Sequence, residues 1–277
     1  MILRGDKLAQ KINKEETKKE IQKFRVKPGL AVILVGNNPA SKLYVKLKKE
    51  IAKKININFY KFYFSEKTKE TEILKTISKL NQDKNINGII VQLPLPKKFN
   101  TNKIIQSINP QKDIDGFHKK NIKKLMTKNP AIISPLILAI ICLLKSTKQN
   151  LINKSAIIIS KNKIFVDPLK AILQKEKIAY KKIGWIKEIS KKTIKKIESA
   201  DIIVIGVGQA EILKKEMVKK GAIIIDIGIN KKNNKVRGDV DFKNLKNKAS
   251  FITPVPKGVG PMTVAMLMKN ILKISRR

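Results

Sequence analysis

The stretch LAVILVGNNPASKLYVKLKKE, residues 30–50, predicts a strand that passes through a tight turn into a helix. Residues 30–36 form a short apolar run that ends in glycine, which is typical of a strand buried on both faces. Asn38 is a good helix cap and Pro39 suits the first helical position, so the helix is expected to begin at this point. A buried strand followed at once by a helix is the repeating unit of parallel α/β proteins.

The same alternation continues along the rest of the chain. The buried-strand candidates are residues 30–36, 57–64, 86–96, 155–160, 201–208 and 221–230. Between them, segments such as ETEILKTISKL and EISKKTIKKIES carry apolar residues three and four apart, the spacing of amphipathic helices. The predicted fold class is therefore α/β, with parallel sheets in two lobes and a boundary near residues 116–122. PMTVAMLMKNILKI is expected to form a final helix, with Pro261 in its first turn.

The chain is strongly basic, since 61 Lys and Arg residues stand against 21 Asp and Glu. Basic residues that contact phosphates drive non-specific nucleic-acid binding, so a basic nucleic-acid-binding protein is one interpretation. The pattern favours another, because the lysines are spread along the whole chain and aromatic residues make up 5% of it. Lysine, isoleucine and asparagine share A/T-rich codons, so genome composition accounts for the charge. We expect no specific nucleic-acid partner.

The remaining composition indicates a soluble protein. The chain has a single cysteine, Cys142, so an internal disulfide is excluded. Cys142 lies in the apolar run AIICLL, which makes a reactive thiol unfavourable. The first residues, MILRGDKLAQ, contain no apolar signal core, and no apolar run reaches the ~18 residues of a membrane span. We expect a cytoplasmic protein with no membrane partner and no metal site.

Lys48 has a special position on the helix that follows the first strand. Leu43, Leu47 and Ile51 recur every four residues and are predicted to form an apolar stripe that faces the sheet. Tyr44 and Lys48 are also four apart, so they share the face beside that stripe. A lysine held against an aromatic ring and shielded from water can lose its proton near neutral pH and act as an acid or base. The alternative is a lysine that extends along the stripe with its charge in solvent.

Five segments, in order along the chain, resemble the bifunctional methylenetetrahydrofolate dehydrogenase/cyclohydrolase family. The opening stretch resembles that family's VG-x-x-PAS turn and Tyr-x-x-x-Lys helix, and GIIVQLPLP resembles its VQLPLP strand end. NPQKDIDGFHKKN resembles its P-x-KD-x-DGFH loop, and GAIIIDIGIN with RGDVDF resembles its last strand and GDV turn. FITPVPKGVGPMTVAMLMKN resembles its TPVPGGVGPMT signature. Five ordered matches are far more specific than any single motif, and they cover nearly the whole chain.

This resemblance implies a two-step folate chemistry. The family oxidises 5,10-methylenetetrahydrofolate to the 5,10-methenyl form with NADP, and then hydrolyses it to 10-formyltetrahydrofolate, with tetrahydrofolate as the carrier. The resemblance implies that Lys48 is the acid/base that activates water and that Tyr44 lines the folate site. Gln92 is implied as the neutral partner that orients Lys48, and Asp115 as the acceptor of paired hydrogen bonds from the pterin. The structural alternatives are a strand-end amide for Gln92 and a turn cap for Asp115, a role for which Asp113 is better suited.

A loop near the C-terminus is also implied in substrate binding. Gly258, Gly260 and Pro261 are implied to form a close approach to the folate, although a tight turn alone explains glycines equally well. His118, the only histidine of the chain, follows the DGF turn, and we interpret it as structural because Lys48 already accounts for the catalysis.

The cofactor half departs from the family pattern. The residues implied to contact NADP are Ser160, Lys161, Asn162, Gly208 and Ile229, with Gly228 and Asn230 also matching the pattern. The family's turn usually reads GRS-x-x-VG-x-P, whereas here Ser160 and Val166 replace both glycines and Lys161 replaces the arginine. Glycines let the backbone approach a pyrophosphate, so Val166 is expected to add bulk at that approach. We therefore predict a degenerate NADP site.

The resemblance also implies a division of labour within the chain. Residues 1–119 with the C-terminal helix, 252–277, are expected to form the folate-binding catalytic domain. Residues 120–251 are expected to form a Rossmann-like NADP-binding domain, and a homodimer through this second lobe is implied. Two enzymatic interpretations stay open: a bifunctional enzyme with weakened cofactor affinity, which we prefer, and a cyclohydrolase that has lost the oxidation step.

Overall fold

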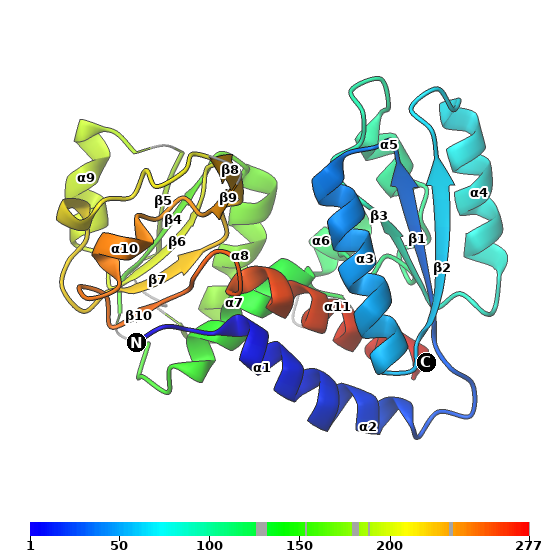
Figure 1. The fold of residues 1–277 in the computed structure, drawn as a ribbon, viewed down its shortest axis with the longest axis horizontal. Helices are drawn as coiled ribbons and strands as arrows, with labels where there is room; N and C mark the ends of the chain where they lie inside the picture. The colour runs from blue at the N-terminus through cyan, green and yellow to red at the C-terminus, as the bar shows by residue number, and fades with distance from the viewer. Residues whose placement is uncertain (126–131, 153, 179–182, 188, 233–234, 277) are drawn as a thin grey trace. The chain divides into compact units, whose positions relative to one another are not determined.

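The computed structural model describes residues 1–125, 132–152, 154–178, 183–187, 189–232 and 235–276, and it confirms the α/β class with parallel sheets (Figure 1). The chain divides into two units. The three-strand unit comprises Ala9–Pro135 and Val264–Arg277, and the five-strand unit comprises Met1–Leu8 and Leu136–Thr263. Among the described residues, none of the helices is both long enough and apolar enough to cross a membrane.

The three-strand unit is built on a parallel sheet of order β2-β1-β3, with β1 at Gly29–Val35, β2 at Asn58–Phe64 and β3 at Gly88–Val91. The central strand β1 is buried along its whole length, as its apolar run predicts. The helices of this unit are α2 (Lys18–Ile21), α3 (Pro39–Lys54), α4 (Glu70–Gln82), α5 (Thr101–Gln106) and α6 (Lys119–Leu125). Helix α1 (Gly5–Lys11), followed by a π-helical segment at Ile12–Thr17, and helix α11 (Val259–Ser275) each run from the five-strand unit into this one.

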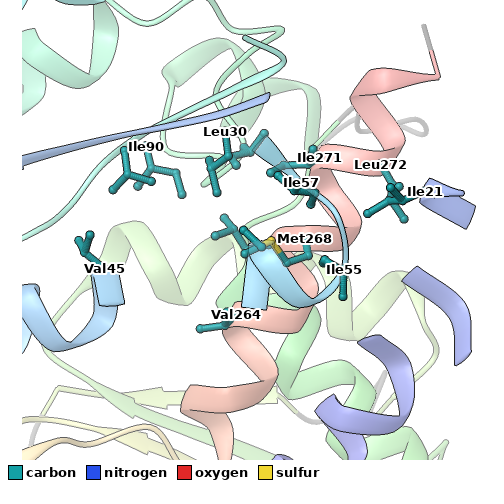
Figure 2. Packing of buried hydrophobic residues seen from close by; sticks show 14 of the residues in the cluster. Ile21, Leu30, Val45, Ile55, Ile57, Ile90, Val264, Met268, Ile271 and Leu272 are labelled. Carbon is teal, nitrogen blue, oxygen red and sulfur yellow. The ribbon is translucent and has the colours of Figure 1, made fainter. Parts of the chain in front are cut away.

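Alternate side chains of β1 enter two separate cores. Leu30 on one face packs in a cluster with Val45 of α3 and Met268 of α11, as Figure 2 shows. Ala31 and every second β1 residue after it point to the other face, where they pack in a second cluster with Ile73 of α4. Full burial of a large aliphatic side chain contributes about 1.5–3 kcal/mol, so these two clusters hold helices on both faces of the sheet.

The apolar stripe predicted for α3 is wrong at Leu43 and Leu47, whereas Ile51 is partly buried and packs against the core. Leu43 and Leu47 are 54% and 40% exposed, whereas the buried positions of α3 are Ser41, Val45 and Ala52. Repeated steps of four residues drift by about 40° each around a helix of 3.6 residues per turn, so a stripe of this spacing leaves the buried face. The smaller side chains are the ones that pack against the sheet. Position 48 falls between Val45 and Ala52 on this same face.

The five-strand unit has a parallel sheet of order β10-β7-β6-β4-β5. Its strands are β4 (Ala156–Ser160), β5 (Ile183–Ile186), β6 (Ile202–Gly206), β7 (Ile223–Asp226) and β10 (Phe251–Ile252), with a separate hairpin of β8 (Asn230–Lys232) and β9 (Lys235–Arg237). The helices are α7 (Pro135–Ser146), α8 (Lys163–Lys175), α9 (Lys191–Glu198) and α10 (Phe242–Leu245), with a 3₁₀ turn at Lys215–Met217. All six predicted strands are present, and the sequence reasoning missed only short ones.

In both sheets, the strand that follows the first one in the chain lies on one side of it, and a later strand lies on the other side, so the strand order reverses there. In the five-strand unit the chain runs from β4 outward to β5 and then returns to place β6 on the other side of β4. Ser160, the last residue of β4, is the register partner of Gly206, the last residue of β6. In the three-strand unit β1 likewise lies between β2 and β3. Parallel α/β sheets bind ligands at the carboxyl ends of strands beside such reversals, so these edges are the expected sites.

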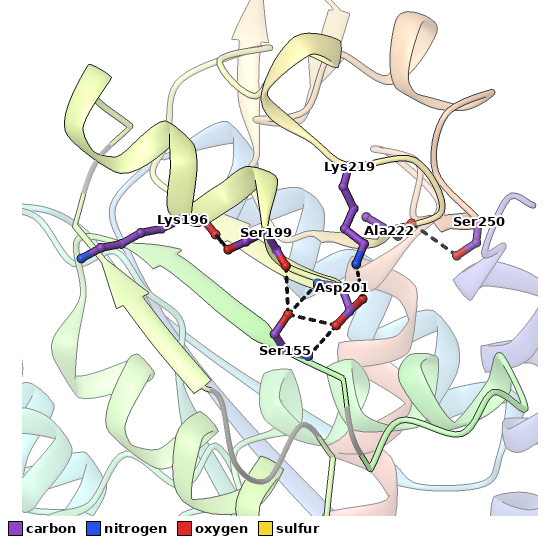
Figure 3. Close-up of polar contacts among 7 residues, drawn as sticks. All are labelled: Ser155, Lys196, Ser199, Asp201, Lys219, Ala222 and Ser250. Carbon is purple, nitrogen blue, oxygen red and sulfur yellow. Dashed lines mark hydrogen bonds and ion pairs between the residues drawn. The ribbon is translucent and has the colours of Figure 1, made fainter.

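The opposite, amino edge of the five-strand sheet is held by a polar cluster (Figure 3). The Asp201 carboxylate, just before β6, accepts hydrogen bonds from the backbone N and Oγ of Ser155, just before β4, at 2.7 and 2.9 Å. Lys219 Nζ lies 2.6 Å from the other carboxylate oxygen. Although partial burial opposes it, these donors lower the pKa of Asp201 to about 2. The cluster fixes the register of β4 and β6 and leaves their carboxyl ends for binding.

Candidate active site and cofactor loops

Lys48 and Gln92 meet at the carboxyl edge of the three-strand sheet. Lys48 lies in the third turn of α3, and Gln92 directly follows β3. Lys48 Nζ donates a hydrogen bond of 2.8 Å to Gln92 Oε1. Gln92 Nε2 donates at 2.8 Å to the carbonyl oxygen of Leu93, and the Gln92 backbone N donates at 2.8 Å to the carbonyl oxygen of Ile33 in β1. The amide group is thus fixed with its oxygen toward the lysine.

Burial shifts the pKa of Lys48 and that of Asp115 toward each other. Burial lowers the pKa of Lys48, and the charge of Asp115 opposes that shift. Burial raises the pKa of Asp115 to about 6, with Lys48 opposing the shift and Asp113 adding to it. Gln92 is neutral, so it orients the amine without fixing its charge as a carboxylate would. A lysine of this kind can exchange its proton much more readily than an exposed one.

The other residues around this site have separate roles. The buried Asp113 accepts hydrogen bonds from the backbone N of Gly116 and His118 and from Asn121 Nδ2, at 2.8–3.1 Å. This confirms Asp113 as the cap of the turn, so the half-buried Asp115 is not needed for it. His118 Nδ1 accepts from the backbone N of Lys120 at 3.1 Å, which fits its structural interpretation. Tyr44 is half-buried one turn before Lys48, and burial raises its pKa.

Asn270 is a supporting residue that the sequence reasoning did not identify. It is buried in α11, and its Nδ2 donates to the carbonyl oxygens of Ile114 and Ile133, at 2.9 Å each. Ile114 immediately precedes Asp115, so Asn270 fixes the backbone that carries this carboxylate. The sequence does offer one signal for a buried, hydrogen-bonded side chain here, because Asn270 is the single amide within the apolar pattern of MKNILKI.

The predicted folate loop belongs to the five-strand unit, whereas Lys48, Gln92 and Asp115 belong to the three-strand unit. Gly258 directly precedes α11, and Gly260 and Pro261 lie in the first turn of that helix. A Cβ at Gly258 would lie 2.4 Å from the carbonyl oxygen of Pro254, so backbone packing alone requires glycine there. Lys257 has a φ of +81°, the left-handed region that favours glycine, which explains why the family pattern has glycine at this position.

The turn after β4 is well formed despite its missing glycines. Asn162 caps α8, because its side chain accepts a hydrogen bond of 3.0 Å from the backbone N of Ile164, and its own backbone N donates to Ser160 Oγ at 3.2 Å. Lys161 is exposed on this turn. The expectation that Val166 adds bulk at a phosphate approach is wrong, because Val166 is completely buried inside α8. Its side chain fills the core and leaves the exposed start of the helix unobstructed.

The loop after β6 is the second predicted cofactor element. Gly208 is exposed with a φ of +73°, a conformation that favours glycine, and Ile229 is 52% exposed in the loop after β7. The backbone N atoms of the Val207–Gln209 loop donate to the carboxylate of the buried Asp239. Since β4 and β6 are neighbours, the Ser160–Asn162 turn and the Val207–Gln209 loop flank the same reversal of the sheet.

Fold and site together define a class of protein: a two-domain α/β enzyme with a desolvated lysine in one unit and a doubly wound nucleotide-binding sheet in the other. The chain belongs to the tetrahydrofolate dehydrogenase/cyclohydrolase family. The model of that family's catalytic domain matches residues 3–115, and the model of its NAD(P)-binding domain matches residues 135–277. The resemblance seen in the sequence motifs is therefore confirmed over both parts of the chain.

Individual relatives agree with this assignment along their whole length. A bifunctional protein FolD of Nitratiruptor sp. is 42% identical over 280 residues, which cover 100% of this chain and 98% of that protein. The crystal structure of the bifunctional enzyme FolD of Campylobacter jejuni is 37% identical, with a TM-score of 0.92 over 100% of this chain and 98% of that one. The Trypanosoma brucei FolD structure, complexed with NADP cofactor and inhibitor, is 27% identical, with a TM-score of 0.93 over 100% and 97% of the two chains.

Proposed function

We propose that this protein oxidises 5,10-methylenetetrahydrofolate to 5,10-methenyltetrahydrofolate with NADP and then hydrolyses the product to 10-formyltetrahydrofolate. The observation that carries the proposal is the 2.8 Å hydrogen bond between Lys48 Nζ and Gln92 Oε1 in surroundings that lower the lysine pKa. Full-length identity of about 40% to bifunctional FolD proteins supports both steps.

Lys48 performs the proton transfers of the hydrolytic step. Its neutral amine takes a proton from the water as the water oxygen bonds to the methenyl carbon. The resulting ammonium gives a proton to the nitrogen that leaves as the C–N bond breaks, and the hydroxyl proton passes to the amine as the formyl C=O forms. Desolvation lowers the free energy needed to reach the neutral amine, and the Gln92 oxygen accepts an N–H of either form. General acid–base catalysis of this kind typically contributes about 10²–10⁴-fold to a rate.

The other residues of the proposal bind the folate. Asp115 accepts two hydrogen bonds from the amino and ring N–H groups of the pterin, which requires its ionised form. Tyr44 packs its ring against the folate, and Gly258, Gly260 and Pro261 contribute backbone that approaches it. Asn270 supports Asp115 through its hydrogen bond to the carbonyl oxygen of Ile114.

The residues at the reversal of the five-strand sheet fit NADP. Two loops flank this reversal, and Lys161 and Gly208 are exposed on them. Ser160, Lys161, Asn162, Gly208 and Ile229 would hold the cofactor, which supplies the hydride acceptor of the first step when it is bound. Lys161 offers a phosphate a single charge, whereas the arginine of the family pattern offers a bidentate fork, so we expect affinity below the family norm.

A paired assay tests the whole proposal. Purified protein is incubated with 5,10-methylenetetrahydrofolate and NADP, and reduced cofactor is followed by absorbance, while hydrolysis of 5,10-methenyltetrahydrofolate is followed separately. Both activities are expected, with NADP preferred in a parallel reaction with NAD. Hydrolysis without any cofactor reduction at saturating NADP would leave a cyclohydrolase that has lost its oxidation step. Loss of both would overturn the proposal.

The proposal extends to assembly and location. The family likeness supports a homodimer through the five-strand unit and a cytoplasmic location, and sedimentation of the purified protein tests the first. A nucleic-acid-binding function would show as an affinity that falls steeply with salt and survives Lys48→Met. Weak binding to any polyanion would not count for it, because a formal charge of +40 produces that by itself.

A further inference from the structure

Two short segments of the five-strand unit are locked together through a pair of buried aspartates. Asp226 ends β7, and its carboxylate accepts hydrogen bonds from the backbone N of Gly228, Asp239 and Val240, at 2.9–3.1 Å. Both Asp226 and Asp239 are essentially inaccessible, with exposed fractions of 2% and 0%. Burial raises the pKa of Asp226 to about 7, although its three N–H donors oppose this shift. The charge of Asp239 adds to the rise.

The glycines of these segments are required by the aspartates. A Cβ at Gly238 would lie 1.9 Å from Asp226 Oδ2, and a Cβ at Gly228 would lie 2.3 Å from Asp239 Cγ. Each segment thus supplies one carboxylate and the glycine against which the other carboxylate packs. The arrangement tolerates no side chain at either position, so the two segments hold one relative placement.

Asp239 extends this arrangement to the loop after β6. Its carboxylate accepts from the backbone N of Val207, Gly208 and Gln209 and from Asn230 Nδ2, at distances of 2.5–3.0 Å. Every one of these four partners is a donor, so the carboxyl group serves as an acceptor through both oxygens, which is the behaviour of a carboxylate. Among the described residues, no salt bridge to Asp239 is found.

A buried charge of this kind is poorly explained by stability alone. Burying a charge is costly because the charge loses its hydration, and the hydrogen bonds to it serve first to offset that cost. The specific effect of Asp239 is that its carboxylate brings three successive backbone N–H groups into one concave arrangement around itself. It thereby fixes the conformation of the Val207–Gln209 loop, which flanks the reversal of the sheet where ligands bind.

We infer that Asp239 is a positioning residue for the nicotinamide cofactor, an inference that rests on the proposed oxidation step. By holding Val207–Gln209 and Asn230 in one conformation, Asp239 preorganises the surface on which NADP lies, and no ordering of this loop is needed on binding. Asp239 itself is fully buried and acts through the backbone N–H groups that it holds.

The substitution that tests this inference is Asp239→Asn. An asparagine keeps the shape but offers one acceptor oxygen, and its amino group then faces two of the four donors, which frees the loop. We expect the KM for NADP to rise about tenfold or more, with kcat at saturating NADP changed about threefold or less. Methenyl hydrolysis is the internal control, because its proposed acid/base Lys48 and the partner Gln92 lie in the three-strand unit. Hydrogen exchange of the Val207–Gln209 amides is expected to accelerate.

Three further variants complete the test. Asp241→Asn is the matched control, since Asp241 lies two residues further on and pairs with Lys214 at 3.3 Å; we expect an unchanged KM for NADP. Gly228→Ala displaces the Asp239 carboxylate without changing its charge and is expected to repeat the defect. Asn230→Ala removes one of four donors and is expected to raise the KM by about two- to fivefold, with little risk to folding.

The outcomes separate this inference from the proposed function. Absence of NADP reduction by the wild-type protein defeats the oxidation step, and titration of NADP binding with hydrogen exchange then decides the role of Asp239. Wild-type NADP affinity in folded Asp239→Asn and Asn230→Ala variants overturns the inference alone. A parallel loss of both activities in all variants, in proportion to the loss of folded protein, would overturn it as well and leave Asp239 purely structural.

Discussion

The two units present different chemistry at equivalent edges of their sheets. In the three-strand unit the groups at the carboxyl edge are side chains, Lys48 and Asp115, whose pKa values are shifted by burial and by each other. In the five-strand unit the groups at that edge are largely backbone, and a buried carboxylate, Asp239, arranges them. In the proposed function the first edge transfers protons, and the second holds a shape. Substitutions should therefore affect rate at the first edge and affinity at the second.

The largest effect is expected for Lys48→Met, which removes the amine but keeps much of the side-chain volume. Methenyl hydrolysis should fall about a thousandfold or more, since no other described group replaces this acid/base. NADP affinity should not change, and circular dichroism should show an unchanged fold. The matched control is Lys46→Met, an exposed lysine on the same helix, for which we expect wild-type rates. Near-normal hydrolysis in Lys48→Met would remove Lys48 from the mechanism.

This difference between the two edges also explains what the sequence could and could not predict. The strands were predictable because their apolar runs are short and bounded by turn formers, and the Lys48–Gln92 pair because both belong to recognisable motifs. The stripe on α3 was wrong at Leu43 and Leu47 because smaller residues, here Val45 and Ala52, are the fully buried ones. The Asp239 network was missed because it depends on which backbone N–H groups converge, and no single-residue pattern records this.

Gln92→Glu tests whether the neutrality of the lysine's partner matters. A carboxylate 2.8 Å from Nζ would favour the ammonium form and raise the pKa of Lys48, so less neutral amine is present at any given pH. Hydrolysis at pH 7 should fall about 10- to 100-fold, and the rising limb of the pH–rate profile should move to higher pH. Measurement of kcat from pH 6 to 10 checks this. An unshifted profile would mean that Gln92 does not tune the charge of Lys48.

The pH dependence of folate binding follows from Asp115. Its pKa is raised to about 6 in the folded protein, so the carboxylate that we propose as the acceptor of pterin N–H groups is present above pH 6 and is lost as the pH falls through that value. The KM for 5,10-methylenetetrahydrofolate should rise by up to about tenfold per pH unit below 6. Asp115→Asn should show a high KM that no longer varies with pH in this range. A midpoint near 4, the ordinary value for aspartate, would contradict the burial of this group.

The smallest effect is expected for Lys161→Arg in the five-strand unit. Lys161 is exposed on the turn after β4, and an arginine there can bind a phosphate group through two parallel hydrogen bonds. The dissociation constant for NADP should fall about two- to fivefold, with kcat and methenyl hydrolysis unchanged. Lys163→Arg is the matched control, because Lys163 is also exposed, two residues further along in the first turn of α8, and titration calorimetry should show no change for it. Equal affinities in the wild-type protein and both variants would mean that no phosphate of the cofactor lies at this turn. The second edge would then depend on the Val207–Gln209 loop alone, which makes Asp239 its main determinant.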